Sequence, residues 1–131
     1  MQLAYLSLLI ACALPVVCAG IAKSGMIGKP LGEGGYDNRD PRAWLAKQAG
    51  FRARANAAQA NSFEALPLFI AAVLSAIQMG ASAFWVDTLA ITFVALRILY
   101  IAAYLSDRDL LRTLFWLLAV ACCVGLFFCA V

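Results

Sequence analysis

The stretch Ala57–Met79, AAQANSFEALPLFIAAVLSAIQM, decides how the rest of this chain is interpreted. It is long and apolar enough to cross a membrane as one helix, for which ~20 residues must span ~30 Å of hydrocarbon. It nevertheless carries an acid, Glu64, near its beginning. An ionisable side chain at membrane depth is costly unless it faces a partner or a water-filled cavity, so Glu64 indicates a functional site.

The composition predicts a multi-pass membrane protein. Of the 131 residues, 65% are hydrophobic and 13% charged, and the mean hydropathy is +0.89, whereas a soluble domain is about half apolar and about a quarter charged. The apolar stretches 3–22, 82–105 and 110–131 join 57–79 as expected spans. The first lacks the basic start of a cleavable signal, so we expect it to remain in the protein. These features predict an all-α, four-helix transmembrane bundle in a single membrane domain, residues 1–131, with one long loop, 23–56.

The positions of the basic residues predict the orientation. The 23–56 connection and the one between spans three and four carry the lysines and arginines, which are Lys23, Lys29, Arg39, Arg42, Lys47, Arg52, Arg54, Arg108 and Arg112. By the positive-inside rule both connections face the cytoplasm. Because the number of spans is even, both termini are expected on the non-cytoplasmic side.

Several function classes find no support. The basic residues beside the spans are explained by topology and by contact with lipid head groups, and no motif supports nucleic-acid binding. The chain has no histidine and no metal-ligand spacing. Its five cysteines form no Cys-x-x-Cys pair, and we expect them to pack as small apolar residues.

The long loop has two parts. Residues 24–40 are rich in glycine, which favours turns, and they form either a mobile surface loop or a cover over a site. Asp40 and Pro41 then mark a helix start. Because alanine-rich sequence follows with only Gly50 as an interruption, we expect helix two to extend into the cytoplasm. Pro67 is expected to bend it close to Glu64.

Arg97 provides a possible partner for Glu64. At 1.5 Å per residue, Glu64 lies about 10 Å inside span two and Arg97 about 12 Å inside span three, counted from the same side of the membrane. The two can therefore pair across the bundle. Asn61, Tyr100 and Tyr104 follow helical spacing from them and extend a polar pocket that opens to the cytoplasm. The alternative is an ion pair that only fixes helix packing.

These residues resemble known motifs. The segment from Gln59 to Phe69, QANSFEALPLF, is similar to the helix-two motif of the MAPEG family, the membrane-associated proteins of eicosanoid and glutathione metabolism. The arrangement of Arg97, Tyr100 and Tyr104 resembles the helix-three motif of that family. The resemblance covers the whole chain in length and span order. It implies a homotrimer of four-helix protomers with glutathione as cosubstrate between neighbours. The segment 37–42 resembles bacterial members, which implies a bacterial inner membrane.

The resemblance also implies roles for individual residues. Glu64 would receive the amino group of glutathione, and the arginine and tyrosines of helix three would orient its carboxylates and backbone. Arg112 is similar to the family arginine that stabilises the thiolate, although one residue further from Tyr104. Lys23 resembles a basic residue that ends helix one. The implied glutathione-binding set is Gln59, Asn61, Glu64, Arg97, Tyr100, Tyr104, Arg54 and Lys23, with Arg112 as the catalytic residue.

Two positions depart from the family pattern. Ala57 stands where many members have a glutathione-binding arginine, and Ala65 where a tyrosine often follows the glutamate. Arg54, one helical turn before Ala57, is the candidate to replace that arginine. Glutathione binding is therefore expected to be weaker, differently arranged or absent.

The resemblance implies a glutathione-dependent transferase or peroxidase that acts on lipophilic electrophiles or hydroperoxides. A nearby arginine favours the thiolate, which is the reactive nucleophile, and no histidine is needed. Two alternatives stay open. One is a small proton-coupled exporter that uses Glu64, and the other is a membrane scaffold that keeps the fold without the activity.

Overall fold

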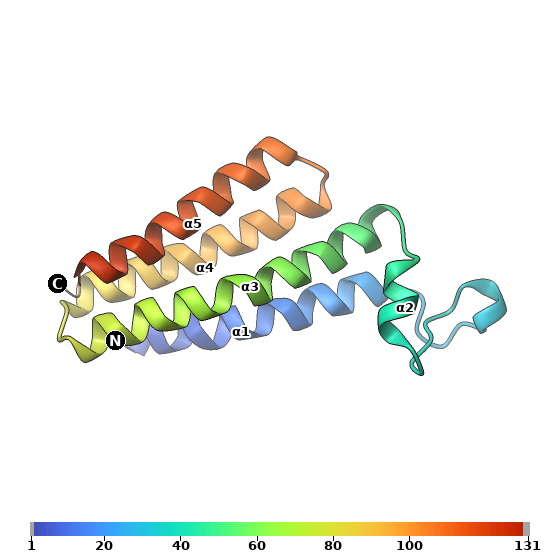
Figure 1. Ribbon diagram of the computed structural model, residues 1–131, viewed down its shortest axis with the longest axis horizontal. Helices are drawn as coiled ribbons and strands as arrows, with labels where there is room; N and C mark the ends of the chain where they lie inside the picture. Colours follow the sequence, from blue (N-terminus) through green and yellow to red (C-terminus); the bar gives the residue numbers. More distant parts are fainter. Residues whose placement is uncertain (1, 130–131) are drawn as a thin grey trace.

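The chain forms a bundle of four long helices (Figure 1). The segment between the first two of them, residues 24–49, is folded at one end of the bundle, and we call it the cap. The computed structural model describes residues 2–129. The long helices are α1 (Gln2–Lys23), α3 (Gly50–Gln78), α4 (Ala83–Leu105) and α5 (Asp109–Cys129). All four are long and apolar enough to span a membrane. This confirms the predicted all-α fold with four spans, apart from residues 130 and 131 of the last expected span, which lie outside the described residues.

The helices alternate in direction, so that four helix ends meet beside the cap (Figure 1). The end of α1, the start of α3, the end of α4 and the start of α5 lie there, while the two described ends of the chain lie at the opposite end of the bundle. α4 packs against α1, α3 and α5, and α3 also contacts α5. The first halves of α3 and α5 and the second half of α4 therefore surround one region.

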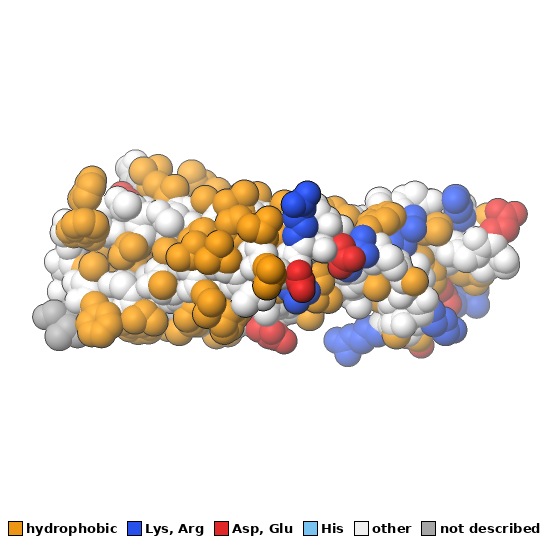
Figure 2. Space-filling view, turned by 90° about the horizontal axis from the view of Figure 1, so that it is seen from above, with side chains coloured by type: hydrophobic (Ala, Val, Ile, Leu, Met, Phe, Trp, Pro, Cys, Tyr) orange, Lys and Arg blue, Asp and Glu red, His pale blue; other side chains and the backbone are white. Residues whose placement is uncertain are grey.

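Charged side chains gather at the cap end of the molecule, whereas apolar side chains cover much of the bundle (Figure 2). Many large apolar residues along the helices are exposed, including Leu9, Val16 and Phe128 at 68%, 69% and 77%. Such an apolar exterior suits a lipid environment, in which no hydrophobic effect drives these side chains inward. The protein is a multi-pass integral membrane protein.

The helix start at Asp40 is confirmed, but the helix that begins there is short. The Asp40 carboxylate accepts a hydrogen bond from the Ala43 N–H at 3.1 Å, as an N-cap does. This helix, α2 (Pro41–Ala46), ends before Lys47. α3 then begins at Gly50, whose φ of 61° is a left-handed conformation that favours glycine. Pro67, where a bend was expected, lies inside α3, and the helix continues past it.

The loop before α2 is folded. It contains a short 3-10 turn, Leu31–Glu33, and the buried Trp44 donates a hydrogen bond from Nε1 to the Gly34 carbonyl at 3.3 Å. The ring of Tyr36 meets that of Trp44 edge to face, with centroids 5.2 Å apart. These contacts give the cap an aromatic centre of its own.

We expect Gly35→Ala to disrupt this cap. A Cβ atom at Gly35 would lie 2.0 Å from the carbonyl oxygen of Lys29, a backbone atom that cannot move aside without unfolding the turn. Limited proteolysis in detergent should then cleave residues 24–40 much faster than in the unchanged protein. Gly32→Ala is the matched control, because nothing lies within 4 Å of a Cβ there. Equal cleavage rates for the two variants would contradict the expectation.

Candidate functional site

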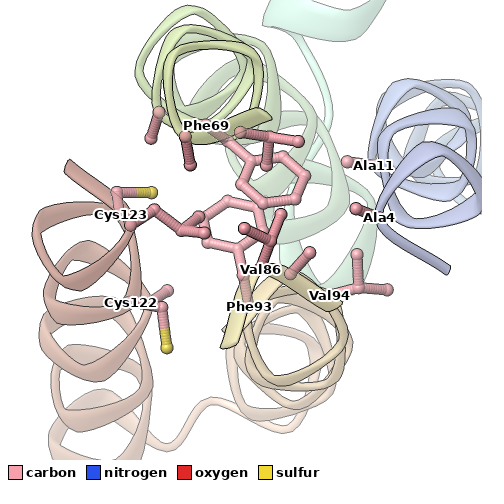
Figure 3. Packing of buried hydrophobic residues seen from close by; sticks show 14 residues of the cluster. Ala4, Ala11, Phe69, Val86, Phe93, Val94, Cys122 and Cys123 are labelled. Atoms are coloured by element: carbon pink, nitrogen blue, oxygen red, sulfur yellow. The ribbon is translucent and has the colours of Figure 1, made fainter. Parts of the chain in front are cut away.

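Arg97 lies in a polar layer between two apolar clusters of the bundle. The larger cluster includes Phe69 and Phe93, whose rings stack with centroids 3.8 Å apart (Figure 3). The smaller one, nearer the cap, includes Cys18 and Tyr100. On α4, Arg97 comes between Phe93 and Tyr100 and is only 2% exposed. A buried cation at this depth needs polar partners, which the neighbouring turn of α3 supplies.

Asn61 connects Arg97 to Glu64. The guanidinium Nη2 of Arg97 donates to Asn61 Oδ1 at 2.9 Å, and Asn61 Nδ2 donates to Glu64 Oε2 at 3.2 Å. Within residues 2–129 Glu64 and Arg97 make no direct ion pair, so the expected direct pairing was wrong. The reason is geometric: Asn61 and Glu64 lie one helical turn apart on the same face, and the amide occupies the space between the two charges.

Two tyrosines continue this layer toward α5. The Arg97 guanidinium carbon lies 4.1 Å from the centroid of the Tyr100 ring. Tyr100 meets Tyr104 edge to face at 5.7 Å, and the Arg112 guanidinium carbon lies 4.6 Å from the centroid of Tyr104. Cations are attracted to the faces of aromatic rings, by about 0.5 to 2 kcal/mol each. The four side chains thus form a cation–aromatic stack between Arg97 and the start of α5.

A cavity of about 180 Å³ opens between α3, α4 and α5, beside Arg97. Its polar wall consists of Asn61, Glu64 and Arg97. The apolar wall consists of Ala65, Leu68, Phe93, Trp116, Ala119, Val120 and Cys123. The structure therefore brings three of the predicted site residues to one cavity. Tyr100, Tyr104 and Arg112 are not part of its wall and reach it only through Arg97.

The remaining predicted residues lie around this centre. Gln59 has a buried Oε1 atom with no hydrogen-bond donor among residues 2–129. Arg54 donates from Nε to the carbonyl of Leu105 at 3.2 Å, which attaches the start of α3 to the end of α4. Lys23, the last residue of α1, lies over the ring of Tyr36 in the cap, with Nζ 4.6 Å from its centroid.

Some residues of the site were not predicted from the sequence. Ser62 is buried, and its hydroxyl oxygen accepts a second hydrogen bond from Arg97 Nη2 at 3.4 Å. The indication in the sequence that Ser62 belongs to the site was its position directly after Asn61. Trp116 and Cys123 also line the cavity. Their place in the cavity depends on how α5 is rotated against α3, for which the sequence carries no motif.

Comparison with known protein families gives a match. The sequence model described as the MAPEG family matches residues 3–131. The comparisons with curated proteins and with solved structures give no match.

Proposed function

Because the chain belongs to the MAPEG family, we propose that it is a membrane-bound, glutathione-dependent transferase or peroxidase that acts on lipophilic electrophiles or hydroperoxides. The observation that carries the proposal is the connected layer in which Glu64, Asn61 and Arg97 line a cavity and the aromatic stack leads on to Arg112. Charged side chains at membrane depth raise the free energy of the folded protein unless a ligand or a partner compensates their charge.

The chemistry of glutathione suits these side chains. The tripeptide carries an ammonium group, two carboxylates and a thiol. In the proposed arrangement the Glu64 carboxylate receives the ammonium group, and Arg97, Tyr100 and Tyr104 orient the carboxylates and backbone. The unpaired Gln59 Oε1 offers an acceptor for a peptide N–H. Each of these contacts to a charged group is worth about 1.5 to 3 kcal/mol.

Arg54 is the proposed replacement for the arginine missing at Ala57. Within the described part of the chain, residues 2–129, only its Nε makes a hydrogen bond, to Leu105, so the two terminal nitrogens are free to bind a carboxylate. Because Nε is tied to α4, the guanidinium has less freedom than a fully exposed side chain. Lys23 contributes positive charge from the cap end and is the most distant member of the proposed set.

The homotrimer is part of the proposal. In a single protomer the side chain of Glu64 is exposed, midway along α3, a helix long and apolar enough to span a membrane. An exposed carboxylate facing lipid is unfavourable, so a neighbouring protomer and bound glutathione would both cover it. The same proposal places the cap in the cytoplasm, where glutathione is available, and both termini on the opposite side, in the inner membrane if the source is bacterial.

The proposal is tested by calorimetric titration of the detergent-purified protein with glutathione. Glu64→Gln removes the charge but keeps an oxygen that can accept from Asn61, so the fold should persist. We expect its glutathione affinity to fall at least about tenfold, the equivalent of one lost charge-assisted hydrogen bond.

Glu33→Gln is the matched control, since Glu33 is an exposed acid in the cap. It should bind as the unchanged protein does. A folded wild-type protein that binds no glutathione would contradict the proposal and would favour a scaffold that keeps the family fold without its activity.

A further inference from the structure

The cap contains a cavity of about 290 Å³, which is larger than the one beside Arg97. Its wall includes Leu31 and Gly34 from the loop before α2 and Trp44 from α2 itself. All of the described residues that line it lie between positions 31 and 48, outside the membrane-spanning helices. The cap extends beyond the ends of α1 and α3 (Figure 1). A ligand therefore reaches this cavity from water and not from the bilayer.

Two side chains of opposite charge line the cavity without pairing. The Asp37 carboxylate accepts a hydrogen bond at Oδ1 from the Arg39 N–H at 2.9 Å, whereas its Oδ2 has no donor among residues 2–129. The Lys47 ammonium group likewise has no acceptor in that part of the chain. A ligand with a single charge compensates only one of these groups. A small molecule that carries both an ammonium group and a carboxylate compensates both.

Gln48 adds an acceptor to the same wall. Its Nε2 donates to the Trp44 carbonyl at 3.0 Å, which fixes the orientation of the amide. Its Oε1 then has no donor within the described residues 2–129. An amide oxygen only accepts hydrogen bonds, so it suits an ammonium group and not a carboxylate. Together with Asp37, Gln48 gives the cavity two acceptors for a cationic group, against the one cation of Lys47.

The cavity is formed by contacts that need no ligand. Trp44 Nε1 donates to the Gly34 carbonyl at 3.3 Å, which holds the indole in place. The Gly34 N–H donates to the Leu31 carbonyl at 3.1 Å, and the Gly35 N–H to that of Pro30 at 3.0 Å, so the turn that carries Leu31 is closed. Because the wall is already ordered, binding costs little conformational entropy. Leu31, which is 57% exposed, supplies an apolar part of this wall.

We propose that the cap cavity binds a small zwitterion, namely a free α-amino acid with an apolar side chain. Asp37 and the Gln48 Oε1 atom hold its ammonium group, Lys47 holds its carboxylate, and its side chain lies against Leu31. Ligand pockets commonly have volumes of about 300 to 1,000 Å³, so a cavity of about 290 Å³ suits a molecule at the small end of this range. The site shares no residue with the proposed glutathione set, and the proposal does not rest on the proposed function.

Saturation-transfer difference NMR with L-leucine tests the binding. The full-length protein is placed in phosphatidylglycerol nanodiscs, whose lipid has no ammonium group, and empty nanodiscs serve as the blank. Two analogues keep the leucine side chain but lose one charge: 4-methylpentanoate has no ammonium group, and 3-methylbutylamine has no carboxylate. We expect leucine to bind at least about tenfold more tightly than either analogue, since each lacks one charge-assisted hydrogen bond.

Two substitutions assign the charges. Asp37→Asn keeps an oxygen that can accept from the Arg39 N–H, and Lys47→Met keeps the length of the side chain. Each should weaken leucine binding about tenfold. Asp37→Asn should leave the binding of 4-methylpentanoate unchanged, and Lys47→Met that of 3-methylbutylamine, because the group that each variant has lost does not contact that analogue.

Glu33→Gln and Lys29→Met are the matched controls, because both residues are exposed charges of the cap outside the cavity wall. Both variants should bind leucine as the unchanged protein does. The lipid phosphatidylethanolamine carries an ammonium group and a phosphate, so the titration is repeated in nanodiscs that contain it, and we expect the same leucine affinity. An affinity about tenfold lower there would assign the cavity to the lipid head group and overturn the proposal. A leucine signal no greater than that of empty nanodiscs, or equal losses in Lys29→Met and Lys47→Met, would also overturn it.

Discussion

Arg112→Ala is expected to slow glutathione-dependent turnover about 30-fold at pH 7 while glutathione still binds. An unperturbed cysteine thiol has a pKa of about 8.5, so only about 3% of it is thiolate at pH 7. A neighbouring arginine lowers the thiol pKa and makes the thiolate the main form. Removing Arg112 can therefore slow turnover at pH 7 by no more than the ratio of the thiolate fractions with and without the arginine, which is about 30-fold. Within residues 2–129 the Arg112 guanidinium rests on the Tyr104 ring and makes no hydrogen bond to the chain, so its N–H groups are free for this role.

The pH profile separates this role from a structural one. If Arg112 acts by lowering the thiol pKa, the rate of Arg112→Ala should rise with pH and approach that of the unchanged protein above about pH 8.5. The ultraviolet absorbance of the bound thiolate at pH 7 should fall in parallel. Arg108→Ala is the control, since Arg108 is an exposed base four residues earlier, just before α5 begins. A loss of rate that high pH does not restore would contradict the thiolate role.

The helices and the members of the polar layer were largely predictable from the sequence. In a membrane every backbone polar group must be paired, and one apolar run of about 20 residues achieves this by itself as a helix. This is why the expected span 3–22 and the observed α1, Gln2–Lys23, nearly coincide. The helical spacing of Asn61 to Glu64, and of Arg97 to Tyr100 and Tyr104, likewise depends only on positions within one helix.

Contacts between helices were harder to predict. Depth along the membrane placed Glu64 and Arg97 in one layer, but it carries no information on how each helix is rotated. For that reason the bridging position of Asn61 and the second acceptor, Ser62, were missed. The position of Cys123 in the cavity wall was missed for the same reason, because it depends on how α5 is rotated. The cap was uncertain for a different reason: its order depends on a few contacts of Trp44 with residues about ten positions away, and glycine content does not reveal them.

Arg97→Met is expected to leave the protein folded but to abolish measurable glutathione binding. Methionine is flexible and apolar, and it fills irregular space between the two apolar clusters that border Arg97. The substitution leaves no buried charge without a partner, because the hydrogen-bond partners of Arg97 are the neutral Asn61 and Ser62 and the side chain of Glu64 is exposed. Asn61 and Ser62 each lose a donor, but the Asn61 amide lies close enough to the cavity for water to replace it.

This substitution distinguishes a binding role from the packing role that the same residues also allow. If Arg97 only fixes the arrangement of α3 against α4, Arg97→Met should change thermal stability and leave glutathione titration normal. If it holds the carboxylates of glutathione, the variant should unfold near the temperature of the unchanged protein and bind nothing. Arg97→Lys separates the effect of the charge from that of the guanidinium shape. Lysine keeps the charge, but it lacks the planar face that stacks on Tyr100 and the two-pronged geometry that binds both oxygens of a carboxylate. It should bind more weakly than arginine and more tightly than methionine. Normal binding by a folded Arg97→Met protein would remove Arg97 from the site and leave the layer as a packing feature of the bundle.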